Sequence, residues 1–136
     1  MNLICKLLRV GKIKPRIREK LEDEGIIVAE QSLSGVLINT RTGGARRKTW
    51  FAGAFVLTKE RITVLGFSRK LINIKFCDSL INNLTVSSIG SNKIKFHFHL
   101  GDFKENTADQ VTIFLKSPKA NLFIEKYHEL SDTFPS

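Results

Sequence analysis

The chain has 136 residues, of which 42% are hydrophobic and 26% are charged. This length and composition indicate one folded domain and exclude a disordered chain. The 22 basic residues exceed the 13 acidic ones by nine. A net charge of +9 favours an anionic partner, such as a lipid headgroup, nucleic acid or an acidic protein surface, without choosing among them. Because no apolar run suits a signal peptide or a membrane span, we expect a cytoplasmic protein.

Residues 1–24 form a basic extension that we expect to be helical. The first 20 residues contain seven basic side chains and one acidic side chain, and so hold two thirds of the net charge. Four apolar residues at helical spacing form a stripe that must pack on the domain, on a partner or on a membrane surface. The docking candidates are Leu3, Ile4, Lys6, Leu7, Leu8 and Arg9. A second helix is expected from Pro15 to about Glu24, with Gly25 just past its end.

From Gly25 onward the hydrophobic period changes from helical to two. The clearest case is 93–100, where apolar residues take one face and Lys95, His97 and His99 take the other. The expected strands are 26–39 (bent near Ser34 and Gly35), 51–57, 62–64, 72–76, 84–88, 93–100 and 111–115. Turn-forming residues separate them, which predicts sequential antiparallel pairing with mostly short connections.

The last expected element is a helix from Ser117 to Leu130, because Ser117 suits the cap and Pro118 the first turn. Its apolar face must cover a sheet. The sequence thus predicts a mainly β domain over 25–130, a seven-stranded antiparallel bent sandwich or partly open barrel capped by the carboxyl-terminal helix. Residues 131–136 would form a tail.

A short motif carries a family resemblance. The run from Phe51 to Val64 reads F-x-G-x-F-x-L-T-x-x-R-I-x-V. It resembles the second-to-third strand hairpin of bacterial pleckstrin-homology-like (PH-like) and GRAM-type domains. Alternate apolar residues enter the core, Gly53 lets the sheet bend, and Thr58 can hydrogen-bond in the turn before Arg61. The resemblance spans about Gly25 to Leu130.

The resemblance implies a binding module rather than an enzyme. Some members of this group bind phosphoinositides and others bind peptides, and for many no ligand is identified. Basic residues of the first two strands and their loop contact phosphates in lipid-binding members. The corresponding candidates, with a possible extension of the patch, are Arg41, Arg46, Arg47, Lys48, Lys59, Arg61, Arg69 and Lys70. The competing interpretation is a solvated loop with edge-strand cations that discourage sheet association.

Other chemistry has little support in the sequence. Cys5 and Cys77 match no metal or redox spacing and are expected to be reduced thiols. His97 and His99 are expected to be a solvent-facing pair, with no metal and no cofactor. No catalytic motif is present, so neither an enzyme nor a small-molecule substrate is expected. Trp50 and Phe67 either form a stacking platform for single-stranded nucleic acid or belong to core and hairpin packing.

The leading hypothesis is a non-catalytic interaction module that engages an acidic partner through a basic face. That partner is a protein surface, self-association included, or an anionic phospholipid headgroup at the periphery of the inner membrane surface. The alternative is a charge-driven nucleic-acid-binding protein, whose affinity for duplex DNA falls steeply with salt.

Overall fold

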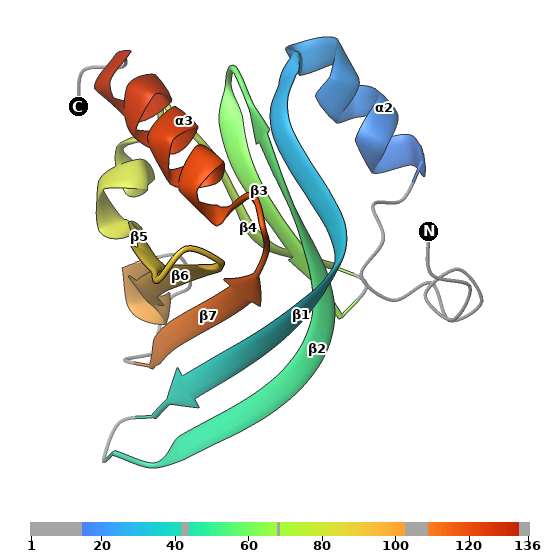
Figure 1. Cartoon of the computed structure of the whole chain (residues 1–136). Helices are drawn as coiled ribbons and strands as arrows, with labels where there is room; N and C mark the ends of the chain where they lie inside the picture. The colour runs from blue at the N-terminus through green and yellow to red at the C-terminus, as the bar shows by residue number, and fades with distance from the viewer. Residues whose placement is uncertain (1–14, 42–43, 68, 103–108, 134–136) are drawn as a thin grey trace.

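The computed structural model describes residues 15–41, 44–67, 69–102 and 109–133. The expected first helix and its six docking candidates therefore lie outside the described residues. Seven strands form one curled antiparallel sheet in the order β4-β3-β2-β1-β7-β6-β5 (Figure 1). The strands are β1 Ile26–Thr40, β2 Arg46–Thr58, β3 Arg61–Gly66, β4 Arg69–Lys75, β5 Thr85–Ile89, β6 Lys93–His99 and β7 Gln110–Lys116. With the carboxyl-terminal helix α3, Ala120–Thr133, they confirm the PH-like fold class expected from the sequence.

The pairing is sequential except at two places. Strand β1 also pairs with β7, which brings the two ends of the domain together, and β4 and β5 form the two edges of the sheet. A 3₁₀ helix, η1 Ser79–Asn83, stands between those edges where we expected a simple turn. The Asp78 carboxylate caps it by accepting the Leu80 N–H at 2.9 Å. A second 3₁₀ turn, η2 Leu100–Asp102, ends the predicted strand 93–100 one residue early.

The bend in β1 lies earlier than predicted. Ser32 has a φ of 62°, and the pairing of β1 with β2 shifts register between Glu30 and Leu33. An unpaired residue bends the strand and increases its twist. The expected bend near Ser34 and Gly35 was therefore placed two residues too late.

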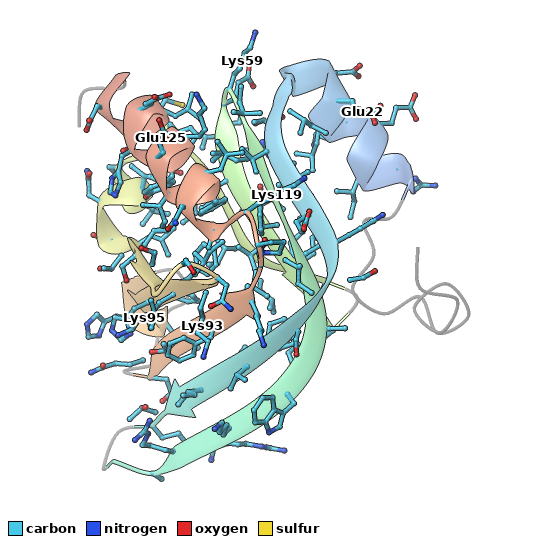
Figure 2. The ribbon with its side chains drawn as sticks, viewed as in Figure 1. Glu22, Lys59, Lys93, Lys95, Lys119 and Glu125 are labelled. Carbon is cyan, nitrogen blue, oxygen red and sulfur yellow. The ribbon has the colours of Figure 1, made fainter. Side chains whose placement is uncertain are left out.

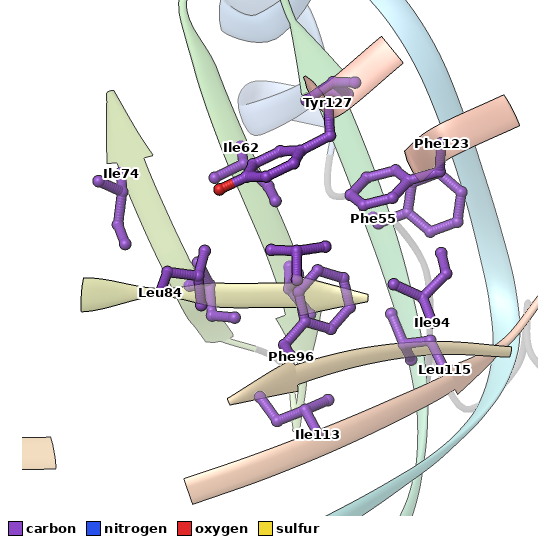
Figure 3. Close-up of a cluster of buried hydrophobic side chains, with 14 of the residues drawn as sticks. Phe55, Ile62, Ile74, Leu84, Ile94, Phe96, Ile113, Leu115, Phe123 and Tyr127 are labelled. Atoms are coloured by element: carbon purple, nitrogen blue, oxygen red, sulfur yellow. The ribbon is translucent and has the colours of Figure 1, made fainter. Parts of the chain in front are cut away.

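Helix α3 fills the interior of the curled sheet. The Phe123 ring is fully buried, with its centroid 4.7 Å from that of Phe55 and 5.7 Å from that of Phe96, both in edge contacts (Figure 3). The Ser117 hydroxyl accepts the Lys119 N–H at 3.0 Å, as a helix cap does. The helix continues to Thr133, so the predicted end at Leu130 was three residues short.

The Phe51 ring lies against three glycines of three adjacent strands. A Cβ atom at Gly35, Gly53 or Gly66 would approach that ring to 2.7, 2.7 and 2.5 Å respectively, which is closer than van der Waals contact allows. The Phe67 ring stacks on Phe51 with the two centroids 4.9 Å apart. Gly53, expected to let the sheet bend, thus makes room for an aromatic ring.

Helix α2, Pro15–Glu24, packs on the opposite side of the sheet from α3 (Figure 1). Its Leu21 is buried against Ala54, Val56 and Leu65. Gly25 ends the helix with a φ of 86°, as predicted from its place in the sequence. This part of the basic extension therefore packs on the domain. None of the helices among the described residues is long and apolar enough to cross a membrane.

Ionic contacts hold the end of α2 to the β2–β3 turn. The Arg61 guanidinium makes two contacts with the Glu24 carboxylate, Nη2 to Oε2 at 2.7 Å and Nε to Oε1 at 2.8 Å. The Thr58 hydroxyl donates to Glu24 at 3.0 Å and accepts the Arg61 N–H at 3.0 Å. The predicted turn role of Thr58 is confirmed, and its hydroxyl also contacts the helix.

Candidate anion-binding face

The sheet surface that faces away from α3 has two halves. Helix α2 covers the half over the second part of β2, where Ala54 and Val56 are fully buried. None of the described elements lies over the other half, which we call the open face. It consists of the outward residues of β2, β1, β7 and β6. The strand register arranges these residues in rows: Arg46–Thr40–Gln110–His99, Lys48–Ile38–Thr112–His97 and Trp50–Val36–Phe114–Lys95, with Lys116–Lys93 beyond.

Five cations stand on the open face, and none of the residues in its rows is acidic. They are Arg46, Lys48, Lys93, Lys95 and Lys116. Figure 2 shows Lys93 and Lys95 beside β6 and β7. Because like charges on one face repel each other in the absence of a counter-charge, an anion bound there gains from several of them together.

Two aromatic rings lie among these cations, each with a lysine ammonium near it. The Lys48 Nζ is 4.9 Å from the centre of the Trp50 ring, and the Lys93 Nζ is 5.8 Å from the centre of the Phe114 ring. The Trp50 side chain is 69% exposed. With this exposure Trp50 does not belong to the core, so the core-packing interpretation of this residue is wrong.

The rings and lysines surround a shallow hollow of about 390 Å³. Its lining residues are Ser34, Val36, Ile38, Lys48, Trp50, Lys93, Phe114 and Lys116. Because β1 lies between β2 and β7, its Val36 and Ile38 form the floor of the hollow between the Trp50 and Phe114 rings, and three lysines complete the lining. Such a hollow suits a ligand that has both a flat apolar part and a negative charge.

His97 and His99 extend the open face, and the expectation of a solvent-facing pair is confirmed. Their ring centroids are 5.7 Å apart, and His97 Nδ1 lies 2.9 Å from the Thr112 hydroxyl oxygen. Burial, the neighbouring His99 and the Lys95 ammonium lower the pKa of His97 from 6.5. His97 is therefore mainly neutral at pH 7 and gains charge only as the solution becomes acidic. The described residues contain no group of three or more His, Cys, Asp or Glu side chains that could hold a metal ion.

The predicted loop cluster is not a loop. Strand β2 begins at Arg46, so Arg46, Arg47 and Lys48 alternate between the two faces of the sheet. Arg46 and Lys48 stand on the open face, and Arg47 points to the opposite face. Arg41 is exposed at the end of the β1–β2 hairpin, next to residues 42–43, which lie outside the described part.

The other predicted cations do not extend this patch. Lys59 lies in the β2–β3 turn, at the opposite end of the 13-residue strand β2 from Arg46. Arg69 and Lys70 begin the edge strand β4, and the Arg69 guanidinium lies 6.0 Å from the centre of the Phe67 ring. The Arg61 side chain is 11% exposed and pairs with Glu24, so its inclusion as an anion-binding candidate was wrong.

Four contributors to the open face were not among the candidates: Lys93, Lys95, Lys116 and Phe114. The sequence did indicate that three of them point away from the core, because Lys93 and Lys95 alternate with the core residues of β6, and Lys116 follows the last core residue of β7. Which strands lie beside β1 was not evident from that alternation. Without the β1–β7 pairing, nothing placed these lysines near Lys48.

Comparisons with known proteins found no matching family model and no matching curated protein. Among solved structures, the chain is similar to the PH domain of Slm1 in complex with inositol-4-phosphate. The two share 13% sequence identity with a TM-score of 0.35, over 82% of this chain and 98% of that one. The fold class rests on the strand order and the helix of this chain.

Proposed function

We propose that the chain is a non-catalytic interaction module that binds an acidic partner on its open face. The supporting observation is the concentration of five cations and an exposed tryptophan on an uncovered half-sheet without an acidic residue in its rows. An acidic protein surface and an anionic phospholipid headgroup both present the charge this face attracts. A cytoplasmic location, at the membrane periphery where the partner is a lipid, belongs to this proposal.

The magnitude follows from the number of cations. Each basic residue close to an anionic surface contributes about 1 kcal/mol at moderate ionic strength. Removing three lysine charges from the open face should therefore weaken binding by about 3 kcal/mol, or about 150-fold. Three lysines elsewhere on the surface should contribute much less, because screening acts over about 8 Å at physiological salt.

Two charge variants with the same net charge test this. The open-face variant carries Lys48→Gln, Lys93→Gln and Lys116→Gln. The control variant carries Lys59→Gln, Lys70→Gln and Lys75→Gln, which lie on the β2–β3 turn and the edge strand β4. Binding is measured by sedimentation with phosphatidylcholine vesicles with and without phosphatidylserine, and by titration with polyglutamate and polyphosphate.

We expect the open-face variant to lose binding to every anionic probe and the control variant to keep most of it. Equal losses in the two variants would mean that net charge, rather than the open face, attracts the partner. No binding of the unmodified chain to any of these probes at low salt would overturn the proposed function.

A further inference from the structure

We propose that the partner of the open face is a single-stranded nucleic acid, with bases stacked on Trp50 and Phe114 and phosphates near the surrounding lysines. This inference rests on the proposed function and identifies the chemistry of its ligand. Three features support it: the composition of the hollow, the arrangement of rings and cations, and the width over which the cations are spread.

The composition of the hollow suits a base followed by a phosphate. Val36 and Ile38 provide an apolar floor, and the exposed Trp50 ring provides a flat π surface beside it. A nucleobase has a flat face that stacks on such a ring, and its phosphate lies only a sugar away. A sugar-phosphate headgroup has no flat apolar face to use this floor, and its hydroxyl groups would lose hydrogen bonds to water there.

Each of the two rings stands beside a lysine. Trp50 and Phe114 occupy the same register row, on either side of β1, and each has a lysine ammonium within 6 Å of its ring centre. Two strand spacings place the backbones of these residues roughly 10 Å apart. A flexible chain can therefore place one base at each ring while its phosphates meet Lys48 on one side of this row and Lys93 and Lys116 on the other.

The spread of the cations favours a polymer over a single headgroup. Arg46 and Lys48 stand on β2, Lys116 on β7, and Lys93 and Lys95 on β6. Three strand spacings, roughly 14 Å, separate the outer two of these strands. A chain of linked phosphates can neutralise all five cations at once. Duplex DNA fits less well, because its bases are stacked on one another and cannot reach Trp50 or Phe114.

The test uses the only tryptophan of the chain as its reporter, because the sequence has a single one. Four probes are compared at the same salt concentration: oligothymidine, an abasic oligomer with the same number of phosphates, a duplex of the same length, and vesicles that contain phosphatidylserine. Oligothymidine should quench the Trp50 emission and bind about tenfold or more tightly than the abasic oligomer. The duplex should bind more weakly than oligothymidine.

A pair of aromatic variants separates stacking from charge. Trp50→Leu should weaken oligothymidine binding about tenfold, measured by anisotropy of a labelled oligomer, and should change binding of the abasic oligomer less than about twofold. Phe67→Leu removes an exposed ring outside the open face and serves as the control, with an unchanged affinity expected. Circular dichroism verifies that both variants are folded.

The outcomes distinguish this inference from the proposed function. If the chain binds abasic oligomer and oligothymidine equally, or binds vesicles more tightly than either, the nucleic-acid inference is wrong while the anion-binding face stands. If the Lys48, Lys93 and Lys116 substitutions leave binding of every probe unchanged, the proposed function fails, and this inference fails with it.

Discussion

The contact of Phe51 with Gly35 allows a sharp test of how the sheet is packed behind the open face. In Gly35→Ala, the new Cβ would lie 2.7 to 3.0 Å from three outer atoms of the Phe51 ring and would meet no closer group. The ring must shift, and it is also stacked on Phe67. Gly35 has an ordinary backbone conformation, so alanine itself is compatible with the strand.

The expected cost follows from two opposing effects. Overpacking of a well-packed site costs about 1 to 3 kcal/mol. Reduced entropy of the unfolded chain returns about 0.4 to 1 kcal/mol. These ranges leave a net cost of about 0 to 2.6 kcal/mol, and because the Phe51 ring is also held by Phe67, Gly35→Ala should lower the free energy of unfolding by about 1 to 2 kcal/mol. Phe51→Leu alone should cost less than the 3 to 5 kcal/mol typical of a Phe→Ala change.

A double-mutant cycle measures the coupling. Leucine lacks the outer ring atoms that the alanine Cβ approaches, so Gly35→Ala should cost at least about 1 kcal/mol less in the Phe51→Leu background. Gly53→Ala is the comparison, because its Cβ would also lie 2.8 Å from the Leu65 carbonyl oxygen, which Phe51→Leu leaves in place. Urea denaturation of the single and double variants provides the values. Additive costs for the Gly35 and Phe51 changes would refute the Phe51 ring as the group that an alanine at position 35 meets.

Two further predictions concern the ion pair and the open face. Glu24→Gln leaves the nearly buried Arg61 guanidinium without its counter-charge. The change should lower the free energy of unfolding, measured in urea, by about 2 kcal/mol. A loss below about 0.5 kcal/mol would mean that solvent screens this ion pair as it screens a surface pair. Because the pKa of His97 is lowered in the folded chain, the unfolded chain takes up a proton at a higher pH than the folded chain does. The contribution of His97 to stability is therefore present above pH 6.5 and is lost as the pH falls below it. His97→Gln should reduce this acid sensitivity in denaturation between about pH 7.5 and 5.5, and an unchanged pH dependence would remove His97 as its source.

Much of the fold could be predicted because its signals are local. The alternation in β6 and β7 reports burial on one face, and the Pro15 and Gly25 positions mark the ends of α2. The bend at Ser32 was missed because a serine with positive φ leaves no mark in the hydrophobic pattern. The η1 helix was missed because a short 3₁₀ turn and an ordinary turn use the same residue types.

The candidate site was harder to predict because it depends on long-range pairing. The run Arg46-Arg47-Lys48 is contiguous in sequence, which suggested a loop cluster, and strand formation divides it between two faces. Lys93 and Lys116 are far from Lys48 in the chain and join it only through the β1–β7 and β6–β7 ladders. Arg61 looked available because its partner, Glu24, belongs to a helix 37 residues earlier.

Strand β2 itself shows why the open face is a surface rather than an unfinished core. Along one side of this strand, Lys48 and Trp50 are exposed, whereas Ala54 and Val56 are fully buried under α2. The change from large or charged to small apolar residues occurs where the helix begins to cover the sheet. The Glu24–Arg61 pair fixes the end of α2 at the β2–β3 turn, at the far end of the strand from Arg46. A helix placed over Lys48 and Lys93 would take their ammonium groups away from water, whereas α2 packs over Ala54 and Val56, so the lysines of the open face keep the exposed charge on which the proposed function depends.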